Sequence, residues 1–205
     1  MKKINALLLL ITIAFTAHSD TSSPNRNFFY FVDGNTTHAW NLTLGDKQKW
    51  NVRIKESEGK SLGGQISLKR SDFKSDGDAV HLNWAARDGV GQFAITGKPI
   101  DLSGVADKVA LTFDINVVTS PREKVKLLMF CDYPCRAEFD LTPILRKVDS
   151  NTWTSIPIPL SCMQARGLDV SKITSPFGLS TEGKLEVKVA NIRMTRLADD
   201  AQSCD

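Results

Sequence analysis

Residues 109–145 read VALTFDINVVTSPREKVKLLMFCDYPCRAEFDLTPIL, and this stretch decides the fold. Its first part alternates apolar residues at positions 111, 113, 115 and 117 with polar ones, which is typical of a strand with one apolar and one polar face. Pro121 interrupts the pattern, because proline has a fixed φ and no backbone N–H. A more continuously apolar strand is predicted over residues 125–130, and a tight loop between Cys131 and Cys135 follows it. Together these segments predict the middle of a β-sandwich.

Short alternating runs separated by turn signals continue on both sides of this stretch. Further strands are predicted at residues 28–32, 40–44, 50–54, 66–68, 79–86, 92–96, 153–160 and 184–194. Pro157 and Pro159 cannot donate to a neighbouring strand, so their run is expected at a sheet edge. A helical turn is predicted at residues 162–168, and no run of helical period reaches the ten or so residues that a helix needs. The predicted fold class is therefore all-β: an antiparallel two-sheet sandwich of jelly-roll type.

The first 19 residues have the features of a secretory signal peptide. Met1-Lys2-Lys3 is basic, residues 4–15 are apolar, and residues 17–19 offer a small-x-small cleavage site. The apolar run is shorter than the roughly 20 residues that span a bilayer, so a retained anchor helix is the less favoured alternative. We expect export to the periplasm or beyond the cell, with a polar segment at residues 20–27, a β-sandwich domain at 28–197 and a polar tail at 198–205.

The charge of the exported chain bears on two classes of partner, nucleic acids and anionic membranes. The 205 residues contain 26 Lys and Arg against 23 Asp and Glu. Cleavage would remove Lys2 and Lys3 and no acid, which leaves 24 against 23 and a net charge of +1. A nearly neutral chain gives no electrostatic basis for binding nucleic acid, or an anionic membrane once the leader is gone.

All four cysteines follow the leader, which fits disulfide formation in an oxidising compartment. Three pairings are open, and we favour Cys131–Cys135 together with Cys162–Cys204. A zinc site is the alternative. Its four thiolates usually come from close CxxC pairs, whereas this chain has a CxxxC pair and two distant cysteines.

The sequence offers little for catalysis. The exported chain has two histidines, His38 and His81, and neither lies in a nucleophile, zinc or phosphate-binding motif. The acidic residues Asp114, Glu138 and Asp140 are expected as outward strand and turn residues. The turn Asp76-Gly77-Asp78 could offer oxygen ligands to a structural calcium ion, although a plain turn is favoured and no cofactor is expected.

Sugars are bound by stacking on aromatic rings and by planar polar side chains that reach the hydroxyl groups. The strand at 79–86 places polar residues opposite its apolar face, and so does the strand at 111–117, which we expect beside it. Three of the four tryptophans alternate with core positions or begin a strand, and the fourth, Trp50, follows a charged turn. The candidate ligand-binding residues are therefore His81, Asn83, Arg87, Asp114, Asn116 and Trp50.

Five segments carry a resemblance to a known family. They are GGQISLKRSD from Gly63, GDAVHLNWAARDGVGQFAITGKPIDLS, VALTFDINV, LMFCDYPCRAEFDLTPIL and TWTSIPIPLSCMQARGLDVSKITSPFGLSTEGKLEVKVANIRM. From about Phe28 to Thr195 the chain resembles the galactose-binding-like C-terminal domain of bacterial family 3 exo-β-glucosidases. The resemblance implies a non-catalytic, carbohydrate-binding β-sandwich. It transfers no binding residues, and the glucosidase carboxylates are expected to lie on catalytic domains that this chain does not contain.

These observations lead to one functional hypothesis and two alternatives. The leading hypothesis is a secreted, non-catalytic module that binds a β-glucan or a related oligosaccharide on one sheet face. The first alternative is an interaction module that docks on a secreted glucosidase or another exported protein. The second is a small glycoside hydrolase, which would need two carboxylates about 5–9 Å apart in a cleft.

Overall fold

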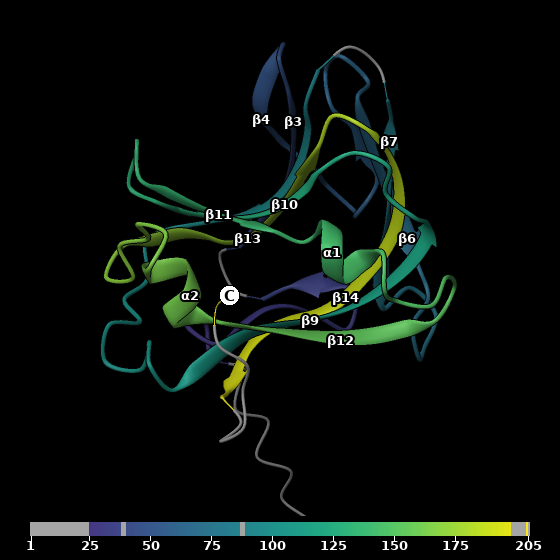
Figure 1. The fold of residues 1–205 in the computed structure, drawn as a ribbon. Coiled ribbons are helices and arrows are strands. Elements are labelled where there is room, and N and C mark those ends of the chain that lie inside the picture. The colour runs from purple at the N-terminus through teal and green to yellow at the C-terminus, as the bar shows by residue number, and fades with distance from the viewer. Residues whose placement is uncertain (1–24, 38–39, 87–88, 198–203, 205) are drawn as a thin grey trace, which may run out of the picture.

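The computed structural model describes residues 25–37, 40–86, 89–197 and 204. The predicted signal peptide, most of the polar segment at 20–27, His38, the candidate Arg87 and nearly all of the tail lie outside these residues. Within them the chain forms two antiparallel sheets packed face to face, which confirms the predicted all-β sandwich (Figure 1). No helix in the described ranges is long and apolar enough to cross a membrane.

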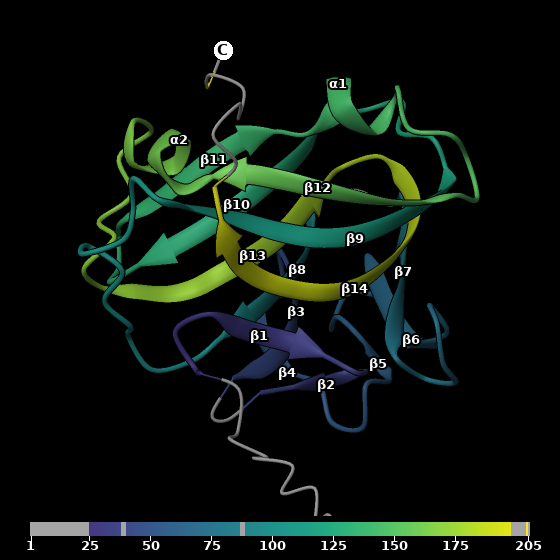
Figure 2. The same cartoon turned by 90° about the horizontal axis from the view of Figure 1, so that it is seen from below.

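The larger sheet has eight strands, six of which follow one another from edge to edge. In that order they are β12 (Trp153–Pro159), β9 (Val109–Thr119), β14 (Lys184–Arg196), β7 (Ala79–Ala85), β6 (Ile66–Ser71) and β5 (Gly59–Lys60). The remaining two, β1 (Phe29–Val32) and β2 (Asn35–Thr36), extend the sheet from β14. Figure 2 shows β12, β9 and β14 side by side across the middle of this layer.

The smaller sheet has six strands. They follow the order β11 (Arg136–Asp140), β10 (Val125–Cys131), β13 (Ile173–Thr181), β8 (Gly91–Thr96), β3 (Asn41–Asp46) and β4 (Lys49–Arg53). In Figure 1, β3 and β4 stand at a steep angle to β10 and β11, so this sheet is strongly bent. Two short helices, α1 (Thr142–Leu145) and α2 (Leu160–Gln164), follow β11 and β12, the edge strands of the two sheets.

The core lies between the inner faces of the two sheets. Phe113 of the larger sheet packs edge-to-face on Phe177 of the smaller, with ring centroids 5.0 Å apart, and Phe177 in turn contacts Phe93 at 6.1 Å. Both of the tryptophans Trp40 and Trp84 are also buried. Burying side chains of this size contributes about 1.5–3 kcal/mol each, which makes this interior the main source of stability.

The stretch at 109–145 contains strands of both sheets. β9 belongs to the larger sheet and β10 to the smaller, so the connection near Pro121 crosses from one layer to the other. The prediction that β9 is half buried is wrong, because its first nine residues are all buried. On the polar side, Asn116 pairs with Trp153 of β12, and Phe73 packs on the Trp153 ring with ring centroids 4.6 Å apart.

Other local predictions match the structure closely. β12, with Pro157 and Pro159, lies at the edge of its sheet. The predicted turn at 162–168 corresponds to α2 and to Gly167, whose φ of +94° ends it. The helical turn α1 was not predicted; it begins where the Asp140 carboxylate accepts the Thr142 N–H at 3.0 Å.

Both predicted disulfides are confirmed. Cys131 is bonded to Cys135 and Cys162 to Cys204, and no cysteine remains free. The first closes the loop between β10 and β11, and the second joins Cys204 to α2.

Candidate functional site

A groove with a volume of about 580 Å³ lies on the outer face of the six-stranded sheet. Its floor follows from the strand register: Lys126 pairs with Ser180, and Ser180 pairs with Gln92, so these three polar side chains form a row across β10, β13 and β8. The next row contains Leu128, Gly178 and Ala94, of which Leu128 lines the groove. The groove therefore places a row of hydrogen-bonding groups beside an apolar residue.

Two exposed aromatic rings line this groove. Trp50 of β4 has 51% of its surface exposed, and Tyr133 of the β10–β11 loop has 98%. They are carried by the two opposite edges of the sheet, because β4 and β11 are its outermost strands. Rings in these positions can offer their faces to a ligand that lies across the strands.

The position of Trp50 depends on the β3–β4 turn. The buried Asp46 carboxylate accepts the Gln48 N–H at 3.0 Å and the Gly63 N–H at 2.6 Å. Gly45 must be glycine because an added Cβ would lie 2.4 Å from the backbone oxygen of Trp50. Burial raises the pKa of Asp46, but hydrogen bonds from Ser61 and from backbone N–H groups outweigh it and lower that pKa.

The Tyr133 loop is held by the Cys131–Cys135 disulfide and by a backbone bond between the same residues, in which the Cys131 N–H donates to the Cys135 carbonyl at 3.1 Å. The loop projects from the end of the β10–β11 hairpin. Its short covalent ring restricts the backbone that carries the tyrosine.

The charged groups on the β10–β11 side of the groove are paired. Lys126 Nζ lies 2.7 Å from Glu138 Oε2, and an Arg136 guanidinium nitrogen lies 3.2 Å from Glu138 Oε1. The hydrogen bond from Lys126 and the nearby positive charges lower the pKa of Glu138, despite the opposing effect of burial. This wall therefore presents oriented donors and acceptors with little net charge.

The candidates predicted from the sequence are divided between the two sheets. Trp50 lies in the groove, whereas His81 and Asn83 lie on the outer face of the larger sheet, beside a small pocket of about 290 Å³. There His81 Nε2 is 2.8 Å from Glu186 Oε1. Desolvation by burial lowers the pKa of His81, and Glu186 opposes that effect. Arg87 is outside the described residues.

The interpretation of Asp114 and Asn116 as exposed polar groups beside His81 is wrong. Strand β14 separates β7 from β9, so the two predicted polar faces are not neighbours. Asp114 and Asn116 are only 9% and 6% exposed. Asp114 instead accepts a hydrogen bond from Asn191 at 2.8 Å, where β14 leaves its regular register.

Sequence reasoning missed most of the groove. Gln92, Lys126, Tyr133 and Ser180 come from separate segments, and no local motif brings them together. One signal was available, because Lys126 is a charged residue in an otherwise apolar strand, and its outward position marks the exposed face of β10.

The turn considered for calcium is stabilised by its own backbone. The Asp78 carboxylate accepts the N–H groups of Phe73, Lys74 and Ser75 at 2.6–2.9 Å. Burial raises the pKa of Asp78, but these hydrogen bonds have the larger effect, so the pKa is lowered overall. In the ranges that the structure describes, no group of three or more His, Cys, Asp or Glu side chains could hold a metal ion.

Residues 38–194 match the Exop_C family, described as galactose-binding domain-like. The chain belongs to this family. The match covers most of the sequence and both sheets, and it confirms the galactose-binding-like fold. Comparison with proteins of curated function gave no match.

Solved structures of the same fold come from carbohydrate-active proteins. The exo-1,3/1,4-β-glucanase ExoP of a Pseudoalteromonas species has a TM-score of 0.71 at 18% identity, over 90% of this chain and 22% of that enzyme. Its extra C-terminal domain alone gives 0.70 at 16% identity, covering 86% of this chain and 96% of the domain. The family 30 carbohydrate-binding module of the Clostridium thermocellum cellulase Cel9D-Cel44B gives 0.60 at 15%, covering 85% and 98%.

Proposed function

We propose that this protein is a non-catalytic module that binds a neutral β-glucan in the groove of the six-stranded sheet. The observation that carries the proposal is the pair of exposed rings, Trp50 and Tyr133, on opposite sides of a polar floor. Sugar rings would stack on these aromatic faces, and their hydroxyls would exchange hydrogen bonds with Gln92, Ser180 and Lys126.

The charge distribution favours an uncharged glycan. The lining of the groove is balanced, with three cations (Lys124, Lys126 and Arg136) against three acids (Glu123, Glu138 and Glu182), so the groove has no net charge that would call for a charged ligand. The relatives support the choice of glucan, because the extra C-terminal domain of ExoP belongs to a 1,3/1,4-β-glucanase and the family 30 module to a cellulase.

The state of Glu138 argues against a role for this residue as the general acid of a glycosidase. A glycosidase needs a general acid that stays protonated near neutral pH, and such residues have raised pKa values. The pKa of Glu138 is instead lowered by the hydrogen bond from Lys126, so this carboxyl is ionised and unsuited to donate a proton.

The proposed place of action is outside the cytoplasm. Two disulfides fit an oxidising compartment, and the predicted leader would direct the chain there. An exported module of this kind would hold a glucan close to the cell or to a secreted glycoside hydrolase.

Calorimetric titration with cellotetraose and with a mixed-linkage β-1,3-1,4 tetrasaccharide tests the proposal. At least one should bind the wild type, and Trp50→Ala should weaken that binding about tenfold or more, or about 1.4 kcal/mol, because truncating an aromatic anchor removes its contact area. Trp50→Phe should keep part of the affinity, since it keeps an aromatic face.

His81→Ala and Asn83→Ala serve as matched controls on the opposite sheet, and both should bind as the wild type does. Loss of binding in these variants with normal binding by Trp50→Ala would move the site to the larger sheet. Failure of every glucan to bind the folded wild type would overturn the proposal and favour the alternative of docking on a secreted protein.

A further inference from the structure

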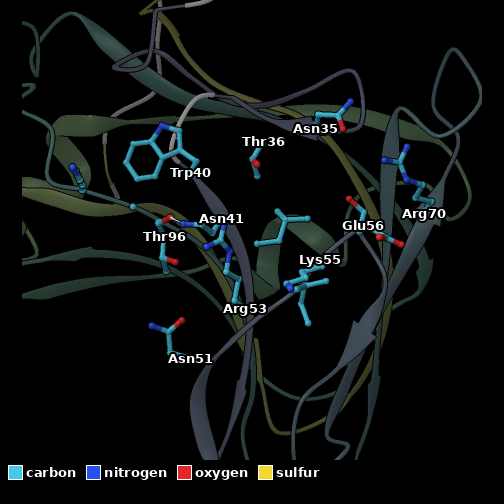
Figure 3. Close-up of a pocket in the computed structure, with 15 residues that line it drawn as sticks. Asn35, Thr36, Trp40, Asn41, Asn51, Arg53, Lys55, Glu56, Arg70 and Thr96 are labelled. Atoms are coloured by element: carbon cyan, nitrogen blue, oxygen red, sulfur yellow. Dashed lines mark hydrogen bonds between the residues drawn. The ribbon is translucent and has the colours of Figure 1, made fainter.

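A second, larger cleft lies beside the groove and shares no lining residue with it. Its volume is about 1030 Å³, and its walls come from β2, β3, β4, the end of β6 and the segments at 54–57 and 96–98. It therefore lies between the β3–β4 edge of one sheet and the β2 and β6 strands of the other. In Figure 3, Lys55 and Glu56 lie between Arg53 and Arg70, and Asn35 lies above them.

The charge in this cleft is strongly one-sided. The cations Arg53, Lys55, Arg70 and Lys98 line it, with Glu56 as the acidic lining residue. Among the described residues, none of these four cationic side chains forms an ion pair or a hydrogen bond. The groove differs, because its lining holds three acids, Glu123, Glu138 and Glu182, against three cations, Lys124, Lys126 and Arg136.

Neutral polar side chains in the lining can form hydrogen bonds with sugar hydroxyls. Thr36, Asn51 and Thr96 add neutral donors and acceptors around the cations. Trp40 also borders the cleft, but it is buried and its indole N–H donates to the Arg26 carbonyl at 3.2 Å. Recognition here would therefore depend on charge and hydrogen bonds, without the exposed ring that the groove provides.

We infer that this cleft binds an acidic oligosaccharide, through carboxylate or sulfate groups held by Arg53 and Arg70. Guanidinium groups bind such oxyanions with paired, charge-assisted hydrogen bonds, and the amide and hydroxyl side chains would contact neighbouring sugar hydroxyls. The concave shape suits a flexible oligosaccharide better than a flat bilayer. The inference does not depend on glucan binding, because the two sites use different residues.

Titration of the full exported chain with three probes tests this inference: tetragalacturonate, a sulfated dextran oligosaccharide and neutral cellotetraose. At least one acidic probe should bind, and raising the salt from about 0.05 to about 0.5 M should weaken its binding, because salt screens exposed charges. The two acidic probes separate carboxylate from sulfate recognition. Cellotetraose reports on the groove alone.

Arg53→Glu combined with Arg70→Glu should reduce binding of the acidic probe by about tenfold or more, as expected when charge-assisted hydrogen bonds are lost. The matched control is Lys147→Glu, which reverses an exposed charge outside both sites and should leave this binding unchanged. Unfolding temperatures of all variants would show that they are folded.

Three outcomes would overturn the inference. The first is that neither acidic probe binds the wild type. The second is that the double variant binds as well as Lys147→Glu does. The third is that Trp50→Ala, which leaves the cleft intact, abolishes binding of the acidic probe, since the probe would then occupy the groove. If the first outcome is found and anionic vesicles bind, the cleft would be assigned to a lipid surface.

Discussion

At the scale of single residues, Asp46 holds the turn that presents Trp50. Its carboxylate accepts backbone N–H groups from Gln48, Lys49 and Gly63, and the carboxylate itself is buried. Asp46→Asn replaces one acceptor oxygen by an NH₂ group that cannot accept a hydrogen bond. We expect the free energy of unfolding to fall by about 1–3 kcal/mol, measured by urea denaturation, and glucan affinity to fall with it.

The same residue makes a testable contribution to acid stability. Its pKa is lowered in the folded protein, where hydrogen bonds outweigh burial, so its stabilising effect is complete above its unfolded pKa of about 3.9. That effect is lost as the pH falls through the lower, folded pKa. The wild type should therefore lose more stability than Asp46→Asn when urea denaturation is repeated from pH 5 towards pH 2, and equal losses would contradict this account.

Titration of His81 makes the folding stability depend on pH in a different range. Burial lowers its pKa although Glu186 opposes the shift, so the unfolded chain binds a proton more readily than the folded one. Stability should therefore fall as the pH drops below about 6.5, the unfolded value. The difference in unfolding free energy between wild type and His81→Gln, measured from pH 8 to pH 5, should shift in favour of the variant. A difference that does not change with pH would refute the prediction.

At the scale of elements, the two disulfides should act differently. The Cys131–Cys135 ring is short and its loss should cost about 2 kcal/mol of stability, whereas loss of Cys162–Cys204 should cost about 4 kcal/mol, because it closes a longer loop. Only the first carries a groove residue, Tyr133.

Serine replacement of Cys131 and Cys135 together should therefore weaken glucan binding, since the loop that carries Tyr133 loses its covalent closure. The matched control is serine at Cys162 and Cys204, which should lower the unfolding temperature more but leave the affinity of the folded protein unchanged. Equal affinities in the two double variants would show that the Tyr133 loop takes no part in binding.

The strands also show which structural features local sequence patterns can predict. Alternation located β7 and β9, and the prolines of β12 correctly placed that strand at an edge. Pattern alone could not show that β14, from the end of the chain, inserts between β7 and β9, because this pairing joins distant segments. It also could not show that Asp114 and Asn116 would be buried.

At the scale of the whole molecule, local sequence patterns also could not show which distant residues meet in the groove. Trp50 was identified because a charged turn precedes it, and a turn favours exposure. The other groove residues are far apart in the sequence and meet through the register of β10, β13 and β8 and through the bend of the sheet. The sequence predicted most of the longer strands but missed β11 and β13, and β13 carries Ser180 of the groove. The face that becomes concave depends on how both sheets pack.

The most direct test of glucan binding in the groove uses the indole N–H signals of the four tryptophans in a ¹H–¹⁵N NMR titration. Trp40 and Trp84 are buried and donate to backbone carbonyls, and Trp153 packs on Phe73, whereas Trp50 is exposed in the groove. On addition of the bound glucan tetrasaccharide, the account predicts that the Trp50 signal shifts most. A saturating titration in which the Trp50 signal stays in place while the Trp153 signal shifts would contradict it.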